Sequence, residues 1–503
     1  MKSRISRVGA VLGGKKKWLV VLAMCAAAGA ASAAFIPNLF PFLDPTGLVS
    51  TENVNGRIDE NNAFFQSLGT NGRSCATCHI AGDAFGLSAT DIQFRYLGSR
   101  GRDPLFASVD GANCPSGQPG NPADHSLLLE NGLIRIPITL PASPQFRISV
   151  VNDPYGCGIV SDRSTGAVTV SVYRRPLPTT NLTFLSTIMF DGRETIQPLN
   201  VQSSFQQNLV VDLMHQAVDA TLTHAQAANP PTTAQQNAIV NFELGLYSAQ
   251  LYDARAGLLT DGGAQGGALN LSQLAPKYDP GINDSLGKDP SGAAFNPSAF
   301  SLYSPWANAT AGRNEPAYQA QGRRDIAAGE VIFNTHPLTI ANVRGLNDNA
   351  AIGSPGSFTG TCTSCHDTPN VGDHSFPLPL DIGTGHNLSA ETDPQIQAAL
   401  AQLSFPNVPV YRITGCPNPF NPSSTEPYVI YTTDPGKGLV TGLCSDVNRV
   451  KGPVLRGLAA RAPYFHNGAA RDLNEVVNFY NQRFQMNLTQ EQESQLIAFL
   501  NSL

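Results

Sequence analysis

Two short cysteine motifs have the residue types and spacing for covalent chemistry. The first is Cys75-Ala76-Thr77-Cys78-His79 and the second is Cys362-Thr363-Ser364-Cys365-His366, so each is a C-x-x-C-H pentapeptide. Two thiols about one helical turn apart can add across the two vinyl groups of one haem, and the imidazole that follows can take an axial position on its iron. The sequence therefore predicts two covalently bound haem c groups. Their attachment residues would be Cys75, Cys78, His79, Cys362, Cys365 and His366, with His79 and His366 as iron ligands.

A structural zinc site is the alternative interpretation of two C-x-x-C pairs. In such a site the two halves normally lie much closer together in the chain than these motifs do. Zinc would also leave the histidine that ends each motif unexplained. The haem interpretation accounts for all six residues.

The first 33 residues have the features of a secretory signal peptide. A basic leader, which includes Lys2 and Lys15–Lys17, precedes an apolar core, Trp18–Ala30, that is too short to cross a membrane as a helix. Ala31-Ser32-Ala33 then matches an A-x-A cleavage site. We expect a periplasmic or secreted protein without a membrane anchor.

The charge balance limits the classes of partner. Removing the six leader cations from 32 lysines and arginines leaves 26 against 38 acidic residues, a net charge of −12. Nucleic acid and anionic membranes are therefore unsuited to this surface. A basic redox protein would suit this acidic surface. The negative charge is equally well explained by a soluble acidic protein that has no protein partner.

Four cysteines outside the leader and the haem motifs remain, an even number in an oxidising compartment. We predict the disulfides Cys114–Cys157 and Cys416–Cys444, because each pair lies on one side of a haem motif and closes a loop of moderate length. The crossed pairings stay open.

The length of 503 residues favours two or three domains. We expect an N-terminal haem domain over 34–256, a linking segment over 257–316 that is rich in Gly, Pro, Asn and Ser, and a C-terminal haem domain over 317–503. Alternating apolar residues within about 113–178 predict a small β insertion in the N-terminal domain.

Helical periodicity dominates the rest of the chain. Asp472 is expected to cap a helix that carries Tyr480, and Thr489 with Gln492 resembles a capping box for the last helix. Phe35–Pro45 is expected to be a surface arm. The other predicted helices are Asn61–Leu68, Val201–Ala225, Thr233–Ala256, one that begins within Asp325–Phe333, and Gln490–Leu500.

The segment Lys451–Gly468 closely resembles the signature of the bacterial di-haem cytochrome c peroxidases and their MauG-type relatives. It contains Pro463-Tyr464-Phe465-His466-Asn467-Gly468, a P-Y-F-H-x-G element. Upstream, Met189–Glu194 looks like the family's W-D-G-R element between the haems. The β insertion and the linking segment have no counterpart in the compact peroxidases.

The resemblance implies two cytochrome-c-like haem domains that face each other. Together with the β insertion and the irregular loops read from the sequence pattern, it leads us to expect a mainly α fold with a small β insertion and long irregular loops. Haem 1, on His79, would be the reactive centre, and haem 2, on His366, would store or relay an electron. The implied oxidant is hydrogen peroxide or dioxygen, and a redox partner protein or an organic donor would supply electrons. His466, and the arginines Arg456 and Arg461 as propionate partners, would contact the cofactors.

Two positions depart from the peroxidase pattern. Where the peroxidases place a Met ligand of haem 2, fourteen residues after His466, this chain has Tyr480, as in the MauG-type enzymes. A Tyr ligand would favour ferric and higher-valent iron, and Met486 is the competing ligand. Phe190 stands where the family has the Trp between the haems, and Trp306 has no sequence feature that would place it there.

The acid/base group of haem 1 has several candidates. His224 lies near the place of the family's catalytic Glu and could move a proton at a pKa close to neutral, or ligate the iron in the resting state. Glu194 is a second catalytic candidate and His215 a weaker one, and a polar helix surface would explain these histidines equally well. His374 and His386 are expected in polar loops, either solvated or in contact with propionates.

Two other functions remain possible from the sequence. A di-haem oxygenase, similar to the rubber oxygenases, would suit the size of the chain and its insertion. A di-haem electron carrier without a substrate would have two strong ligands on both irons.

Overall fold

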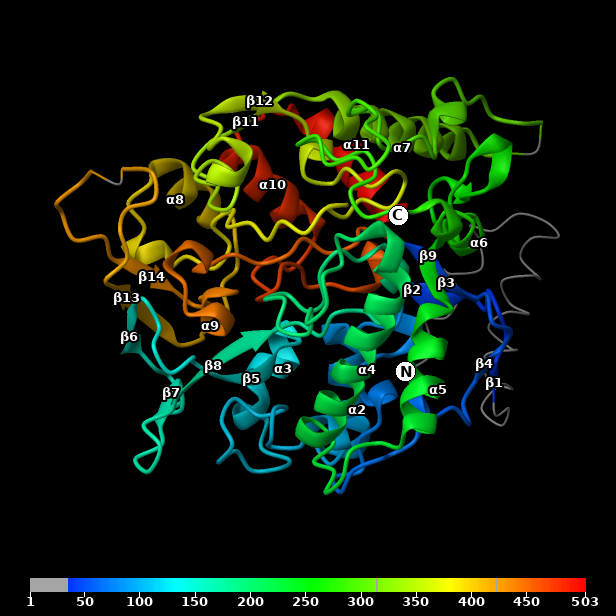
Figure 1. Cartoon of the computed structure of the whole chain (residues 1–503). Helices are drawn as coiled ribbons and strands as arrows, with labels where there is room; N and C mark the ends of the chain where they lie inside the picture. Colours follow the sequence, from blue (N-terminus) through cyan, green and yellow to red (C-terminus); the bar gives the residue numbers. More distant parts are fainter. Residues whose placement is uncertain (1–34, 314, 422) are drawn as a thin grey trace, which may run out of the picture.

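The computed structural model describes residues 35–503 except 314 and 422, so the expected signal peptide lies outside the described residues. Figure 1 shows the N-terminal half, in blue to green, against the C-terminal half, in yellow to red. Among the described residues, no helix has both the length and the apolar content needed to cross a membrane.

Short helices and small sheets alternate along the chain. The helices are α2 Ala89–Ser99, α3 Ser126–Asn131, α4 Phe205–Thr223, α5 Thr233–Leu244, α6 Ala268–Ser272, α7 Ala317–Thr335, α8 Pro394–Leu400, α9 Gly438–Thr441, α10 Leu473–Arg483 and α11 Gln490–Asn501. The strands are β1 Phe35–Ile36, β2 Phe42–Asp44, β3 Gly47–Asn53, β4 Ile58–Asp59, β5 Ile134–Thr139, β6 Arg147–Asn152, β7 Ile159–Ser161, β8 Val168–Arg174, β9 Leu246–Asp253, β10 Gly257–Leu258, β11 Leu338–Ile340, β12 Phe358–Gly360, β13 Val410–Thr414 and β14 Ile430–Thr432.

A four-stranded antiparallel sheet, in the order β10-β9-β3-β2, corrects two predictions. The helix expected to reach Ala256 ends at Leu244, and β9 pairs with β3 from Gly47↔Asp253 to Asn53↔Leu246. Residues 246–250 are buried on both faces of the sheet, so they lack the alternation that marks a half-buried strand. The predicted surface arm is also partly a strand, because β2 pairs with β3.

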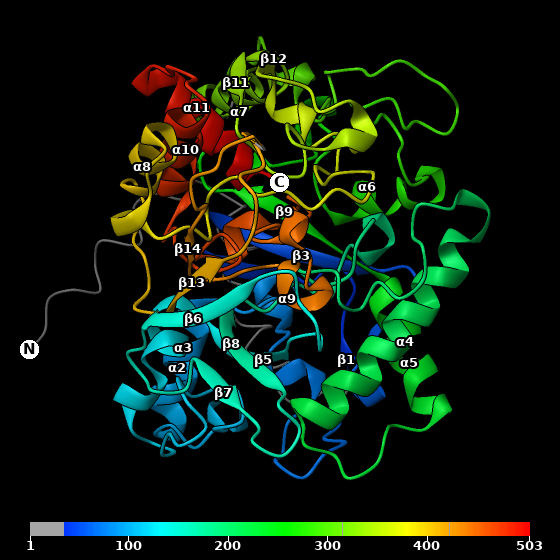
Figure 2. The same ribbon diagram turned by 60° about the vertical axis from the view of Figure 1, so that its left-hand side comes forward.

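The strands expected within 113–178 are present, but they belong to two sheets. Strands β5, β8 and β7 form one sheet, whereas β6 pairs with β13 of the C-terminal half, from Arg147↔Thr414 to Asn152↔Val410. Both figures show β6 beside β13 (Figures 1 and 2). The predicted disulfides Cys114–Cys157 and Cys416–Cys444 are confirmed.

Helices α7, α10 and α11 surround the second cysteine motif. The predicted caps of α10 and α11 are confirmed: Asp472 accepts from the Glu475 amide, and Thr489 forms a capping box with Gln492. Gly329 lets α7 approach α11 closely, because a Cβ there would lie 2.0 Å from the Gln495 carbonyl oxygen. The contact fixes the two helices against each other.

One further segment is less regular than predicted, and the predicted linking segment is packed into the core. Asn61–Leu68 contains only a three-residue 3₁₀ turn, Ala63–Phe65, in place of a helix. The 257–316 segment is irregular, as expected, yet Tyr303 and Trp306 are fully buried in the core formed with α7 and α11. It is therefore packed against the C-terminal half.

Candidate haem-binding cavities

Both C-x-x-C-H motifs fold into the same tight turn. Ser74 and Thr77 form a capping box around the 3₁₀ turn Cys75–Thr77, and Thr361 and Ser364 do the same around Cys362–Ser364. In each motif the histidine amide donates to the carbonyl of the first cysteine over 3.1 Å. The four motif cysteines carry free thiols. The hydroxyl residues that flank the motifs thus position both thiols and the imidazole together.

Each motif histidine is oriented through Nδ1. His79 Nδ1 donates to the Phe85 carbonyl over 3.2 Å, and His366 Nδ1 donates to the Gly372 carbonyl over 2.7 Å. Burial lowers the pKa of His79 to about 4 and also lowers the pKa of His366. Both imidazoles are therefore neutral at pH 7 with Nε2 free, which is the form that binds a metal.

Each motif lines its own large apolar cavity. The first cavity, which holds Cys75, Cys78 and His79, has about 1530 Å³ of empty volume including its mouth. The second cavity, which holds Cys362, Cys365 and His366, has about 1830 Å³. Thiols and a free imidazole nitrogen at the wall of an apolar cavity fit a covalently attached haem.

The two cavities share a wall. The residues that line both are Arg175, Pro176, Leu177, Pro178, Phe190, Lys451 and Pro453. Phe190 is buried, and its ring lies 6.0 Å from the ring of His466. Trp306 lines neither cavity and stacks on Tyr303 instead. An aromatic ring therefore does stand between the cavities, but it is a phenylalanine.

His224 reaches the first cavity from the C-terminal end of α4. Its Nδ1 contacts the buried carboxylate of Asp110, which also pairs with Arg73. Burial would raise the pKa of Asp110, but His224 and Arg73 outweigh it and lower that pKa. The ionised carboxylate holds Nδ1 of His224 and leaves Nε2 free. Arg73 is fixed in turn, since it donates to the Pro104 and Leu105 carbonyls over 2.7 Å.

Sequence reasoning missed Asp110 and Arg73. Arg73 stands two residues before Cys75, a local position that could have been noted. Asp110 meets His224 only through the tertiary fold, because 114 residues separate them.

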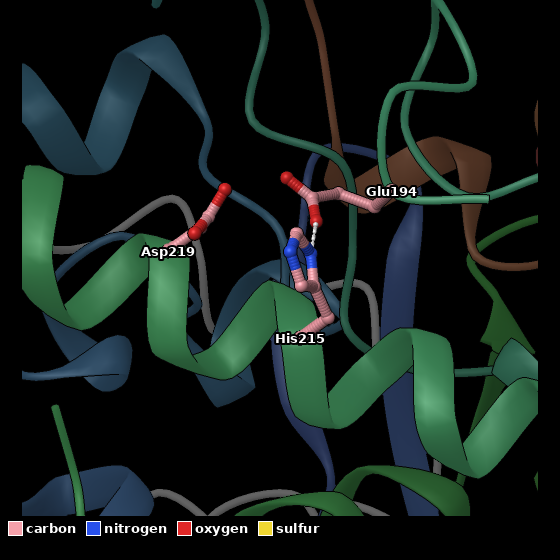
Figure 3. Close-up of side chains that lie close together, drawn as sticks. All are labelled: Glu194, His215 and Asp219. Carbon is pink, nitrogen blue, oxygen red and sulfur yellow. Dashed lines mark hydrogen bonds and ion pairs between the residues drawn. The ribbon is translucent and has the colours of Figure 1, made fainter. Parts of the chain in front are cut away.

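Glu194 and His215 are not in either cavity, which corrects their expected place at the reactive centre. His215 Nδ1 lies 2.7 Å from Glu194 Oε2, and Asp219 stands one turn further along α4 (Figure 3). The side chain of His215 is 44% exposed. The face of α4 that lines the first cavity carries Gln216, Ala217, Ala220 and Thr221 instead.

The aspartate of the Met189–Glu194 element belongs to a buried ion-pair network. Arg174 pairs with Asp191 and, over 2.6 Å, with Asp434, and each of the three side chains is at most 1% exposed. Arg193 adds a pair with Asp191 over 3.0 Å. Burial would raise the pKa of both aspartates, and Arg174 outweighs it and lowers both. The network fixes β8, the 189–194 element and the Asp434 loop together.

Both candidate ligands for haem 2, Tyr480 and Met486, line the second cavity. Burial raises the pKa of Tyr480, so its phenol is neutral unless a metal binds it. His466 lines the same cavity, and its buried Nε2 makes no hydrogen bond among the described residues. Burial lowers the pKa of His466 to about 4. His466 therefore lies at the second cavity, and its contact with a cofactor stays a prediction.

Arg456 lies outside both cavities, contrary to its expected contact with a propionate. Its guanidinium donates to the carbonyls of Asn370 over 2.9 Å and Leu503 over 3.2 Å. Arg461 lines the second cavity, and Arg175 and Lys451 lie in the shared wall. The first cavity is also lined by Arg73, Arg174 and Arg193, which are paired with aspartates. Burial lowers the pKa of Lys451 to about 8. Sequence reasoning missed Lys451, although it opens the Lys451–Gly468 segment.

Neither His374 nor His386 is solvated, which was one of the two alternatives expected for them; the other, contact with a propionate, stays a prediction. His386 pairs with Asp381 over 2.9 Å and with Glu391; burial opposes the charge, but these carboxylates raise the pKa of His386 to about 10. His374 is buried beside Asp367 and lines the second cavity.

Two curated proteins are similar to part of the chain. The cytochrome-c peroxidase IdrP2 of Denitromonas iodatirespirans is 31% identical over 160 residues, 29% of this chain and 37% of that protein. The cytochrome-c peroxidase IdrP1 of Pseudomonas sp. (strain SCT) is 27% identical over 154 residues, 28% of this chain and 36% of that protein. The chain thus spans little more than a third of the length of these relatives. No family model and no solved structure matches it. The chain is thus similar to cytochrome-c peroxidases over part of its length.

Proposed function

We propose that the protein is an exported di-haem c-type oxidoreductase that reduces hydrogen peroxide in the first cavity and exchanges electrons through the second. The observation that carries this proposal is the pair of C-x-x-C-H cavities with a common wall. In this proposal the fold consists of two cytochrome-c-like units, within 34–256 and 317–503, joined by the 257–316 segment.

The residues that would hold the two haems follow from the cavities. Cys75 and Cys78 would form the thioethers of haem 1, and His79 Nε2 would bind its iron. The second motif would do the same for haem 2, with Tyr480 or Met486 as a further candidate ligand. Each haem supplies an iron that exchanges electrons one at a time. Lys451, Arg175 and Arg461 are the cations available to the propionates.

His224 is the group that would move the proton. Its Nε2 can accept a proton from the inner oxygen of peroxide and return it to the outer oxygen as the O–O bond breaks. Asp110 holds the imidazole through Nδ1 and stabilises the imidazolium that forms. Two electrons and two further protons complete the reduction of peroxide to two water molecules.

Electrons would reach the first cavity through the shared wall. A redox partner protein or a small organic donor would supply the electrons at the second cavity, and Phe190 with Pro176–Pro178 lies in the wall between the two cavities. Apart from Arg175 and Lys451, the residues that line both cavities are apolar. The acidic surface favours a basic donor protein.

A pair of histidine variants on α4 tests the proposal. His224→Gln in the holoprotein should slow peroxide consumption by about 10²-fold or more, because the proton acceptor is lost. His215→Gln is the matched control and should leave the rate unchanged, because His215 faces away from the cavity.

Peroxide consumption is followed by stopped flow, with haem attachment measured by mass spectrometry. An equal rate in His224→Gln and the parent protein would remove the proton role of His224. Holoprotein whose Soret band does not respond to peroxide would contradict the peroxidase itself, and absence of covalent haem would contradict the whole proposal.

A further inference from the structure

Three buried side chains converge beside the second cavity, outside the haem ligands. Asp284 comes from the 257–316 segment, Asp367 directly follows His366, and His374 lies in the next loop. Their exposed fractions are 1% for Asp284, 0% for Asp367 and 8% for His374. One oxygen of each carboxylate and Nδ1 of the imidazole all lie within 4.8 Å of one another.

Backbone amides orient both carboxylates. Asp284 Oδ2 accepts from the amides of Leu286 over 3.0 Å and Lys288 over 2.8 Å, while its Oδ1 has no hydrogen-bond partner among the described residues. Asp367 Oδ1 accepts from the Ser375 amide over 2.8 Å, and its Oδ2 accepts a longer bond, 3.4 Å, from the Ser285 amide. The backbone therefore directs Asp284 Oδ1 and Asp367 Oδ2 towards the imidazole, and Asp284 Oδ1 is left without a partner among the described residues.

The imidazole nitrogen at this point is also unpartnered. His374 Nδ1 makes no hydrogen bond in the described part of the chain, and it lies 3.3 Å from Asp367 Oδ2 and 3.9 Å from Asp284 Oδ1. Buried polar atoms without partners are uncommon in proteins, and a bound ion is one of the usual reasons for them.

From this convergence we infer that Asp284, Asp367 and His374 bind a divalent metal ion, Mn²⁺ or Zn²⁺. Two carboxylate oxygens and one imidazole nitrogen suit these ions better than Ca²⁺ or Mg²⁺, which prefer oxygen ligands alone. Ligand atoms about 2.0–2.2 Å from one ion lie about 3.3–3.6 Å apart at a tetrahedral angle. The separation of 3.3 Å matches this range, and the separation of 3.9 Å requires a wider angle at the ion. Water would complete the coordination.

The metal would join the 257–316 segment to the loop that holds haem 2. Hydrogen bonds already run between these segments: Asn283 Nδ2 donates to the Asp367 carbonyl over 3.0 Å, and Ser285 Oγ donates to the Ser364 carbonyl over 2.7 Å. An ion on Asp284 and Asp367 would fix the residue directly after the iron ligand His366.

A proton is the competing occupant of this point. Burial lowers the pKa of His374, but Asp367 and Asp284 raise it with a net upward effect, so an imidazolium between two carboxylates would also balance the charge. The second group of possible ligands, Glu194, His215 and Asp219, carries no such argument, because His215 is exposed and already bonded to Glu194. It serves as the control.

The metal content of the holoprotein tests the inference. The chain is matured in medium that contains MnCl₂ and ZnSO₄ and passed over a chelating resin, and metals are counted by plasma mass spectrometry against haem. We expect about one equivalent of Mn or Zn per chain. Asp284→Asn and His374→Gln should each lose it, whereas Glu194→Gln should keep it.

Loading with Mn²⁺ alone adds a signature that does not depend on the variants. Pulsed electron paramagnetic resonance should show a ¹⁴N coupling from one imidazole to the Mn²⁺. Parent holoprotein with no Mn or Zn beyond a trace, or Mn²⁺ without a ¹⁴N coupling, would overturn the inference and leave the proton as the occupant. Metal retained in both Asp284→Asn and His374→Gln would also overturn it.

Discussion

The substitution Arg174→Met should strongly destabilise the protein at neutral pH. Arg174 is 1% exposed and faces two carboxylates, Asp191 and Asp434, that are 0% and 1% exposed. Met keeps much of the volume but removes the charge, so two carboxylates remain buried without their main cation. Breaking such a buried pair costs about 3–5 kcal/mol. The expected loss is therefore a large share of the stability of a typical domain.

The dependence on pH separates this loss from a packing defect. In the parent protein Arg174 lowers the pKa of both aspartates, so their stabilisation is fully present above the unfolded pKa of about 3.9 and is lost only as pH falls through the still lower folded values. Without Arg174, burial raises those folded pKa values. The carboxylates then protonate as the solution is acidified, and the penalty shrinks by about 1 kcal/mol or more between pH 7.5 and pH 5.

Urea unfolding of the holoprotein, followed by circular dichroism at both pH values, measures the difference. Arg193→Met is the matched control: it removes another cation from Asp191, but Arg193 is partly exposed, so the loss should stay below about 1 kcal/mol. A destabilisation by Arg174→Met that is no larger than that of the control, or that is equal at the two pH values, would refute the electrostatic explanation.

The remaining predictions concern the second cavity and the shared wall. Tyr480→Phe should change the haem 2 spectrum if the phenol is the ligand, and Met486→Leu should change it if the thioether is the ligand. Electron paramagnetic resonance of both variants decides between the two ligands, and two unchanged spectra would exclude both. Lys451→Met should lower the reduction potential of at least one haem by about 60 mV, one decade in a one-electron equilibrium, because a buried cation stabilises the electron. Potentiometric titration checks this, and unchanged potentials in both haems would place the Lys451 charge away from the cofactors.

Local signals were sufficient for some elements. The caps at Asp472 and Thr489 lie within three residues of the amides that they bind, so the starts of α10 and α11 could be predicted from the sequence. The start of β9 could not, because its stability comes from β3, which lies about two hundred residues earlier in the chain. A strand buried on both faces carries no alternation that would distinguish it from a helix.

The candidate site shows the same limit. The haem-attachment residues lie within a motif of five consecutive residues, so they could be predicted from the sequence. Asp110 contacts His224 only through the tertiary fold. The helical period could have shown that His224 and His215 lie on different faces of α4. Ala217, Ala220 and His224 share the face that lines the first cavity, and His215 does not. Arg456 lies in the segment that resembles the family signature, yet its buried guanidinium donates hydrogen bonds to backbone carbonyls and does not reach a cavity.

The pairing of β6 with β13 imposes an order on biogenesis. Residue 147 leaves the ribosome long before residue 414, so the two strands can join only when most of the chain has been synthesised. Contacts between such distant residues form late and slowly. If the proposed function is right, haem attachment to both cysteine pairs could precede the pairing of these two strands. A chain cut between residues 152 and 410 would still contain both β6 and β13, so its two fragments could reassociate through this strand pair.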